Sequence, residues 1–167
     1  DRGIKLSSNG ALQIISALSC SRIVISEVAG EDSSKLYSAL AEYLGCPAYI
    51  SNVSKGYEDS YLFYCQNEDG KAEPTGLSSF IENAEKNANI IHLAVFKGIK
   101  AATLSEALAP YLKYFSNPLR QCKINVKEPP VSFKLPENLW FIMELGEGEG
   151  FDSSSCSILK PAAMLKV

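Results

Sequence analysis

The sequence predicts an α/β domain in three layers, with a mostly parallel sheet between two layers of helices. Short apolar runs rich in β-branched residues alternate along the chain with segments whose apolar residues recur every three or four positions, which is typical of such sheets. The 167 residues suit one domain, so we treat 1–167 as a single unit. At 46% hydrophobic and 21% charged residues, the chain can build a core.

The predicted helices are identified by a capping residue at the start and by apolar residues on one face. The first is capped at Ser8-Asn9 and has Leu12 among its apolar residues. The second opens at Ser33-Ser34, places Tyr43 on its apolar face and ends at Gly45. Helices are expected at about 9–19, 33–44, 77–87 and 104–115, and a short one is expected after the loop 146–150.

The predicted strands are short apolar runs, expected at 22–26, 46–50, 89–96 and 139–145. Segments 122–126 and 131–135 flank a Glu-Pro-Pro turn and predict a small β-hairpin. The polar segment 52–76 is expected to be a loop with room for another hairpin. Because ligands of parallel sheets bind at the carboxyl ends of the strands, a site is expected in the loops after Ser26, Val95 and Leu145.

Charge and composition exclude several classes of protein. A net charge of -3 argues against a nucleic-acid-binding surface, which usually carries a basic excess. No run approaches the roughly 18 apolar residues of a membrane helix. The chain begins at Asp1 without an initiator Met or an apolar signal region, so we expect a cytoplasmic domain cut from a longer chain. The five cysteines are widely spaced, which predicts reduced thiols and neither disulfides nor a zinc site.

The segment from Ile23 to Gly45 has the layout of a phosphate-binding loop, in which a strand, a glycine turn and a helix N-terminus follow one another. With Gly30 as the inner glycine, Ser33 stands where the phosphate-binding Lys belongs and Ser34 where the Mg²⁺-binding hydroxyl belongs. Lys35 lies two residues past the Lys position, roughly 200° further round the helix.

Three carboxylates in the same loop oppose a triphosphate, whose negative charges they would repel: Glu27, Glu31 and Asp32. Such carboxylates can instead cap the helix that follows. Taken by themselves, these residues favour an ordinary capped helix over a nucleotide site.

The run "VISEVAGEDSSKLYSALAEYLG" nevertheless resembles the phosphate-loop region of AAA+ ATPases. It is most similar to the branch typified by the GTP-dependent subunit of methylcytosine-specific restriction systems. The similarity continues in register through three further segments: 57–87, 89–115 and 132–150. It implies the large subdomain of an AAA+ module, with a P-loop NTPase-like fold, on a chain that ends where the helical lid of that family would begin.

The catalytic positions of the family are replaced throughout. Ala94-Val95 stands in place of the Asp-Glu that holds Mg²⁺ and polarises water, and Gly146 in place of the sensor Asn. The "PAAMLKV" end has only Lys166 where the family has arginines. Phosphoryl transfer depends almost wholly on positioned charge and metal. The resemblance therefore implies a catalytically inactive core with no catalytic residue, no metal and no cofactor.

The function expected from this comparison is a scaffold or partner-binding module in a restriction- or defence-type complex, assembled with a protein partner or with itself through AAA+-like faces. Its partner-binding residues are expected on an aromatic loop: Tyr57, Tyr61, Phe63 and Tyr64. The alternative is an NTPase that binds ATP or GTP with Mg²⁺ through a non-standard loop: Gly30, Ser33, Ser34 and Lys35. A third reading is a binder of some other small anion at the helix N-terminus after Gly30.

Two further groups of polar residues invite a functional reading. His92, the only histidine, is expected to be a buried, hydrogen-bonded structural residue, although a catalytic base is the alternative. An acidic cluster is expected to be a solvated loop and not a cation site, since it lacks EF-hand spacing: Glu144, Glu147, Glu149 and Asp152.

Overall fold

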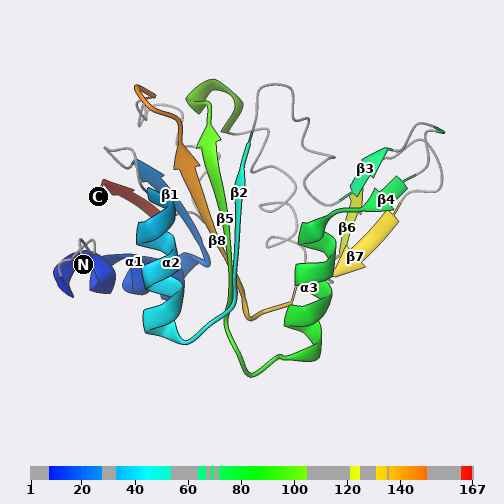
Figure 1. Cartoon of the computed structure of the whole chain (residues 1–167), viewed down its shortest axis with the longest axis horizontal. Helices are drawn as coiled ribbons and strands as arrows, with labels where there is room; N and C mark the ends of the chain where they lie inside the picture. The colour runs from blue at the N-terminus through cyan, green and yellow to red at the C-terminus, as the bar shows by residue number, and fades with distance from the viewer. Residues whose placement is uncertain are drawn as a thin grey trace.

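A computed structural model describes residues 8–27, 33–53, 64–66, 69, 72–104, 121–124, 131–134, 136–149 and 163–166. The centre of the fold is a parallel sheet of four strands in the order β2 (Ala48–Asn52), β5 (His92–Ile99), β8 (Leu139–Leu145) and β1 (Ile23–Glu27), and β9 (Ala163–Lys166) adds a fifth parallel strand beside β1 (Figure 1). The predicted α/β class with a parallel sheet is therefore confirmed.

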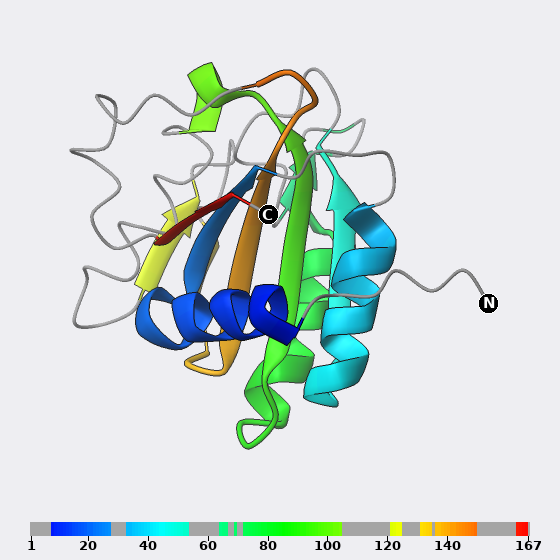
Figure 2. The same ribbon diagram turned by 90° about the vertical axis from the view of Figure 1, so that its left-hand side faces the viewer.

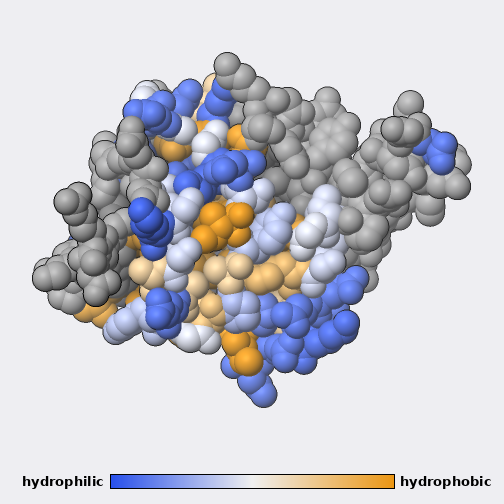
Figure 3. All heavy atoms as spheres, viewed as in Figure 1, coloured by the Kyte–Doolittle hydropathy of each residue, from blue (hydrophilic) through white to orange (hydrophobic). Residues whose placement is uncertain are grey.

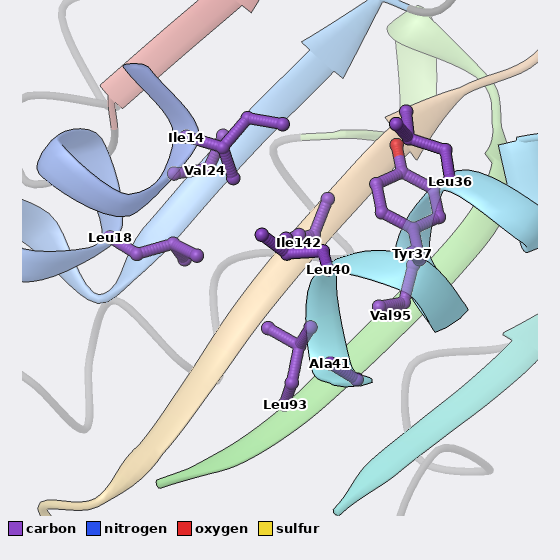
Figure 4. Close-up of a cluster of buried hydrophobic side chains, with 10 residues drawn as sticks. All are labelled: Ile14, Leu18, Val24, Leu36, Tyr37, Leu40, Ala41, Leu93, Val95 and Ile142. Carbon is purple, nitrogen blue, oxygen red and sulfur yellow. The ribbon is translucent and has the colours of Figure 1, made fainter. Parts of the chain in front are cut away.

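One face of the sheet is covered by α1 (Ser8–Ser21) and α2 (Ser33–Leu44), which Figure 2 shows in front of the strands. The apolar side chains of these helices and of the three central strands form one cluster, drawn in Figure 4: Ile14, Leu18, Val24, Leu36, Tyr37, Leu40, Ala41, Leu93, Val95 and Ile142. Gly45 ends α2 with a φ of 61°, the left-handed conformation predicted for a terminating glycine.

The opposite face of the sheet packs against α3 (Gly76–Lys86) through aromatic rings. Phe80 of α3 lies 5.8 Å from the ring of Tyr49 and 5.3 Å from that of His92, measured between centroids. The Nδ2 of Asn138 donates to the carbonyls of Ala84 and Ile90, at 3.0 and 2.6 Å, and so holds the end of α3 beside the start of β8. The sheet thus has helices on both faces.

Two small antiparallel pairs lie outside the main sheet. β3 (Tyr64–Gln66) pairs with β4 (Ala72–Pro74), and β6 (Gln121–Ile124) pairs with β7 (Val131–Lys134). The predicted hairpin insertion around the Glu-Pro-Pro turn is confirmed by the second pair. The helix expected at 104–115 lies outside the described residues beyond Leu104, which follows the short helix η2 (Ala101–Thr103).

Several predicted boundaries and faces were wrong. β2 begins two residues later than expected and β5 three residues later, because Cys46-Pro47 and the turn before His92 are apolar but not extended. Leu12 is 57% exposed and Tyr43 is 74% exposed, since the core faces of α1 and α2 run through Ile14 and Tyr37 instead. A short terminal helix was expected after the loop 146–150, but residues 163–166 form a strand, because a single short edge strand has no apolar periodicity by which the sequence could reveal it.

In Figure 3 hydrophilic residues lie over α3 and a small apolar group lies over β2, the edge strand. None of the helices in the described part of the chain is long and apolar enough to cross a membrane.

Candidate functional site

The candidate site is a layer of polar side chains at the carboxyl ends of the three central strands. Val24, Ile142 and Val95 lie side by side on β1, β8 and β5 and face α2 as part of the apolar cluster. Side chains of a strand alternate between faces, so the residue two positions further along each strand faces α2 as well. These three residues are polar: Ser26, Glu144 and Lys97.

The first turn of α2 closes this layer through two hydrogen bonds. Ser33 Oγ donates to Glu144 Oε1 at 2.9 Å, and both side chains are buried, with 5% and 7% of their surface exposed. Lys97 Nζ donates to Ser34 Oγ at 2.6 Å, and this pair is half-buried. The first two residues of α2 are therefore each held by a charged side chain from a different strand.

Three buried oxygen atoms of the layer have no hydrogen-bond partner: Ser26 Oγ, the Tyr37 hydroxyl and Glu144 Oε2. Figure 4 shows the Tyr37 ring among apolar side chains, with its oxygen pointing toward the arrowhead of β8. Burial raises the pKa of Tyr37 well above its ordinary value, and the negative charge of Glu144 raises it further. The hydroxyl lies close to Ser26 and Glu144, although no hydrogen bond of good geometry joins them.

The loops that follow β5 and β8 are tied to each other beside the layer. The amide of Ala101 donates to Glu149 Oε2 at 3.0 Å, and the amide of Gly146 donates to the carbonyl of Ile99 at 2.9 Å. Gly98 has a φ of 79° and lies where the register of β5 against β8 is interrupted, between Phe96 and Ile99, before Ile99 pairs with Leu145. Lys97 therefore lies within β5, paired with Asn52 of β2, at the point where the pairing with β8 is interrupted.

The structure brings together only part of the predicted site. Ser33 and Ser34 open α2 as expected, while the neighbouring Lys35 is exposed. Gly30 lies outside the described residues, as do three of the aromatic loop residues, Tyr57, Tyr61 and Phe63. The fourth, Tyr64, is the first residue of β3, and its side chain is not described.

Two sequence-based interpretations of polar residues had different outcomes. Glu144 was expected to belong to a solvated acidic cluster, and this is wrong: its side chain is buried, because the inward-facing alternation of β8 continues to the end of the strand. Of its predicted neighbours, Glu147 is exposed and Asp152 lies outside the described residues. His92 is buried as predicted, with Nδ1 2.9 Å from the carbonyl oxygen of Ile90 and Nε2 unpartnered.

Other reactive groups in the described residues do not form a second site. No cluster of three or more His, Cys, Asp or Glu side chains there could hold a metal ion. Cys20 and Cys46 are free thiols, and burial raises the pKa of Cys46, which disfavours the reactive thiolate.

Sequence reasoning missed Ser26, Tyr37 and Lys97 as members of the site. A signal for two of them was present, because Val24-x-Ser26 and Val95-x-Lys97 each place a polar residue on the core face at the end of a buried strand. It was not decisive, since a polar residue can also stand where a strand simply leaves the core. Only the pairing of β1, β8 and β5 places these positions side by side.

No model of a known protein family matches the chain, and a search among curated proteins finds no relative of it. The geometry of the site therefore carries the functional argument.

Proposed function

We propose that this chain is a catalytically inactive AAA+-like core that acts as a scaffold or partner-binding module, with a role in a restriction- or defence-type complex implied by the sequence resemblance. The proposal rests on the order of the strands and on the contacts made by the first turn of α2.

The order of the strands supports an AAA+-like architecture. AAA+ modules place their strands in the order five, one, four, three, two, with the phosphate-loop strand between the fourth and the fifth. Counted along the chain, the five strands of this sheet have the same order: β9, β1, β8, β5 and β2. Rossmann and flavodoxin-like sheets have different orders. In this architecture β1 and α2 flank the phosphate loop, β5 is the strand that carries the metal-side acids, and β8 is the sensor strand.

The hydrogen bond from Lys97 to Ser34 is the main support for the proposal that the core is catalytically inactive. Ser34 stands where the hydroxyl that binds Mg²⁺ belongs, and it already accepts a hydrogen bond from an ammonium 2.6 Å away. A divalent cation bound there would meet the positive charge of Lys97. On the same strand Ala94 and Val95 are fully buried and have no carboxylate to offer. The residues present therefore do not fit Mg²⁺.

The second position of the loop is equally unsuited to nucleotide. Ser33 replaces the Lys that would neutralise the phosphates, and it donates its hydroxyl to the buried carboxylate of Glu144. A triphosphate at this end of α2 would approach that carboxylate with no compensating side chain from Ser33. Phosphoryl transfer, which needs positioned cations, has no support from these residues.

We expect neither Mg-ATP nor Mg-GTP at millimolar concentration to change the melting temperature of the purified chain. A ligand that binds only the folded state at 100 times its Kd adds about 2.7 kcal/mol of stability, which a thermal unfolding experiment detects easily. Mg²⁺ alone is the control for effects of the cation. A clear nucleotide-dependent rise would favour the NTPase alternative, with Gly30, Ser33, Ser34 and Lys35 as the residues to mutate first.

The scaffold reading also predicts assembly that does not depend on nucleotide. In sedimentation velocity experiments over a wide range of concentrations, we expect the chain to form species larger than one copy, unchanged by Mg-ATP. A Tyr61→Ala/Phe63→Ala variant is expected to weaken this assembly, whereas Tyr43→Ala, which removes an exposed ring from α2, is expected to leave it intact. Sedimentation as a single copy at every concentration would contradict self-association.

A further inference from the structure

We propose that two copies of this chain associate about a two-fold axis, with the β6–β7 pair of each copy docked on an acidic surface of the other. The acidic surface consists of Asp69, between β3 and β4, and of Glu82 and Glu85 on α3. The inference rests on the proposed scaffold function, because it names a second copy as the partner in the assembly expected there.

Charge is divided unequally between two stretches of the chain that lie outside the main sheet. Segment 57–86 contains seven Asp or Glu and two Lys, a net charge of -5, and it includes β3, β4 and α3. Segment 113–134 contains five Lys or Arg and one Glu, a net charge of +4, and it includes β6 and β7. Blocks of like charge often belong to surfaces that meet a partner of opposite charge.

The basic block contains an antiparallel pair with two unlike faces. Residues opposite each other in such a pair share a face, and successive residues of a strand alternate between faces. One face is polar and includes two lysines: Gln121 opposite Lys134, and Lys123 opposite Ser132. The other face is apolar: Cys122 opposite Phe133, and Ile124 opposite Val131. This alternation is typical of a sheet that is covered on one face and meets water, or a polar partner, on the other.

The acidic surface belongs to one continuous unit. β4 ends at Pro74 and α3 begins at Gly76, so the β3–β4 pair leads directly into the helix. Asp69, Glu82 and Glu85 are all exposed, and Figure 3 shows hydrophilic residues over α3. Lys86 is the one lysine among the described residues of this unit, so carboxylates outnumber ammonium groups on it.

The positions of the two surfaces permit the same contact to form twice. In Figure 1 the β6–β7 pair and α3 both lie on the side of the sheet opposite α1 and α2, and in Figure 2 the yellow β6–β7 pair lies apart from the green α3. A rotation of 180° about an axis between them brings each surface opposite its complement in a second copy. A nucleic acid would match the basic face alone and would be repelled by the acidic surface, so a second copy is the better partner.

Sedimentation velocity without nucleotide tests the proposal with two charge-reversed variants. Lys123→Glu/Lys134→Glu and Asp69→Lys/Glu82→Lys are each expected to sediment as single copies, because the surfaces that would meet then carry like charge. An equimolar mixture of the two variants is expected to restore the dimer, since one variant has two acidic surfaces and the other has two basic ones. Glu42→Lys reverses an exposed carboxylate of α2, on the other side of the sheet, and is expected to dimerise as the wild type does.

The wild-type dimer is also expected to weaken with salt. Between 0.1 and 1 M sodium chloride the Debye length falls from about 10 to about 3 Å, so we expect the dissociation constant of the dimer to rise at least about tenfold. If one variant does not fold, as judged by circular dichroism, this salt dependence decides alone, and a dimer equally stable at both concentrations overturns the proposal.

The remaining outcomes separate this proposal from the scaffold function. Association that both variants retain, or a mixture that stays as single copies while the wild type associates, overturns the charge-based dimer and leaves self-association standing. A wild type that sediments as a single copy at every concentration contradicts self-association itself. If such a wild type binds a labelled single-stranded oligonucleotide, and Lys123→Glu/Lys134→Glu does not, the basic face belongs to nucleic acid and the proposal is overturned.

Discussion

Ile142→Ala is expected to lower the free energy of unfolding by about 2–5 kcal/mol, the usual cost of truncating a buried isoleucine. Ile142 is fully buried in the middle of β8, between Val24 of β1 and Val95 of β5. Truncation leaves a cavity on the face of the sheet that α1 and α2 cover, where neighbouring strands on both sides restrict relaxation.

Urea denaturation monitored by circular dichroism measures this loss as a lower midpoint at unchanged slope. Ile90→Ala is the matched control, because Ile90 is 44% exposed in the turn before β5 and its truncation is expected to change stability by no more than about 0.5 kcal/mol. Equal effects of the two substitutions would contradict the packing of β8 at the centre of the core.

Above pH 10 the wild type is expected to lose stability relative to Tyr37→Phe by up to about 1.4 kcal/mol per pH unit. Burial, and then the charge of Glu144, raise the pKa of Tyr37 in the folded state above its unfolded value of about 10. The unfolded chain therefore loses this proton at a lower pH than the folded chain does. The contribution is fully present below pH 10 and is lost as the pH rises toward the folded pKa.

Parallel urea titrations of the wild type, Tyr37→Phe and Tyr43→Phe between pH 8 and pH 12 test this expectation. Tyr43 is 74% exposed, so removal of its hydroxyl is expected to leave the pH dependence as in the wild type. At pH 7 Tyr37→Phe is expected to cost little, because the hydroxyl makes no hydrogen bond that would be lost. Identical pH profiles for all three proteins would show that the Tyr37 hydroxyl is not buried beside Glu144.

The polar layer connects these stability measurements with function. A buried carboxylate and two unpartnered hydroxyls lower stability compared with an apolar layer of the same shape. Natural chains depart from good packing mainly where a site requires it. The layer lies at the carboxyl ends of the central strands, the place where parallel sheets bind ligands, and this agreement is the reason to seek a ligand there.

Much of the fold was predictable because it depends on local patterns. The strand predicted at 139–145 is β8, with the same first and last residues, since a long apolar run between turn residues has few alternatives. The starts of β2 and β5 were misplaced because apolar residues such as Cys46 continue past the end of a strand into its turn. Tyr43 was assigned to the core face of α2 because its spacing from other apolar residues fits a helix face. The spacing does not show whether another element covers the ring, and in the structure Tyr43 is exposed.

For the site, the sequence by itself determined that Ser33 and Ser34 open a helix after a strand, without a lysine or metal-side acids, because capping and loop spacing are local properties. It did not place Glu144 and Lys97 at the first turn of that helix, because these residues lie 111 and 63 positions away from Ser33 and Ser34 along the chain. That placement required β8 and β5 to pair in parallel beside β1, and such pairing depends on contacts that no local pattern records. The tertiary structure therefore decided which charged side chains meet the N-terminus of α2.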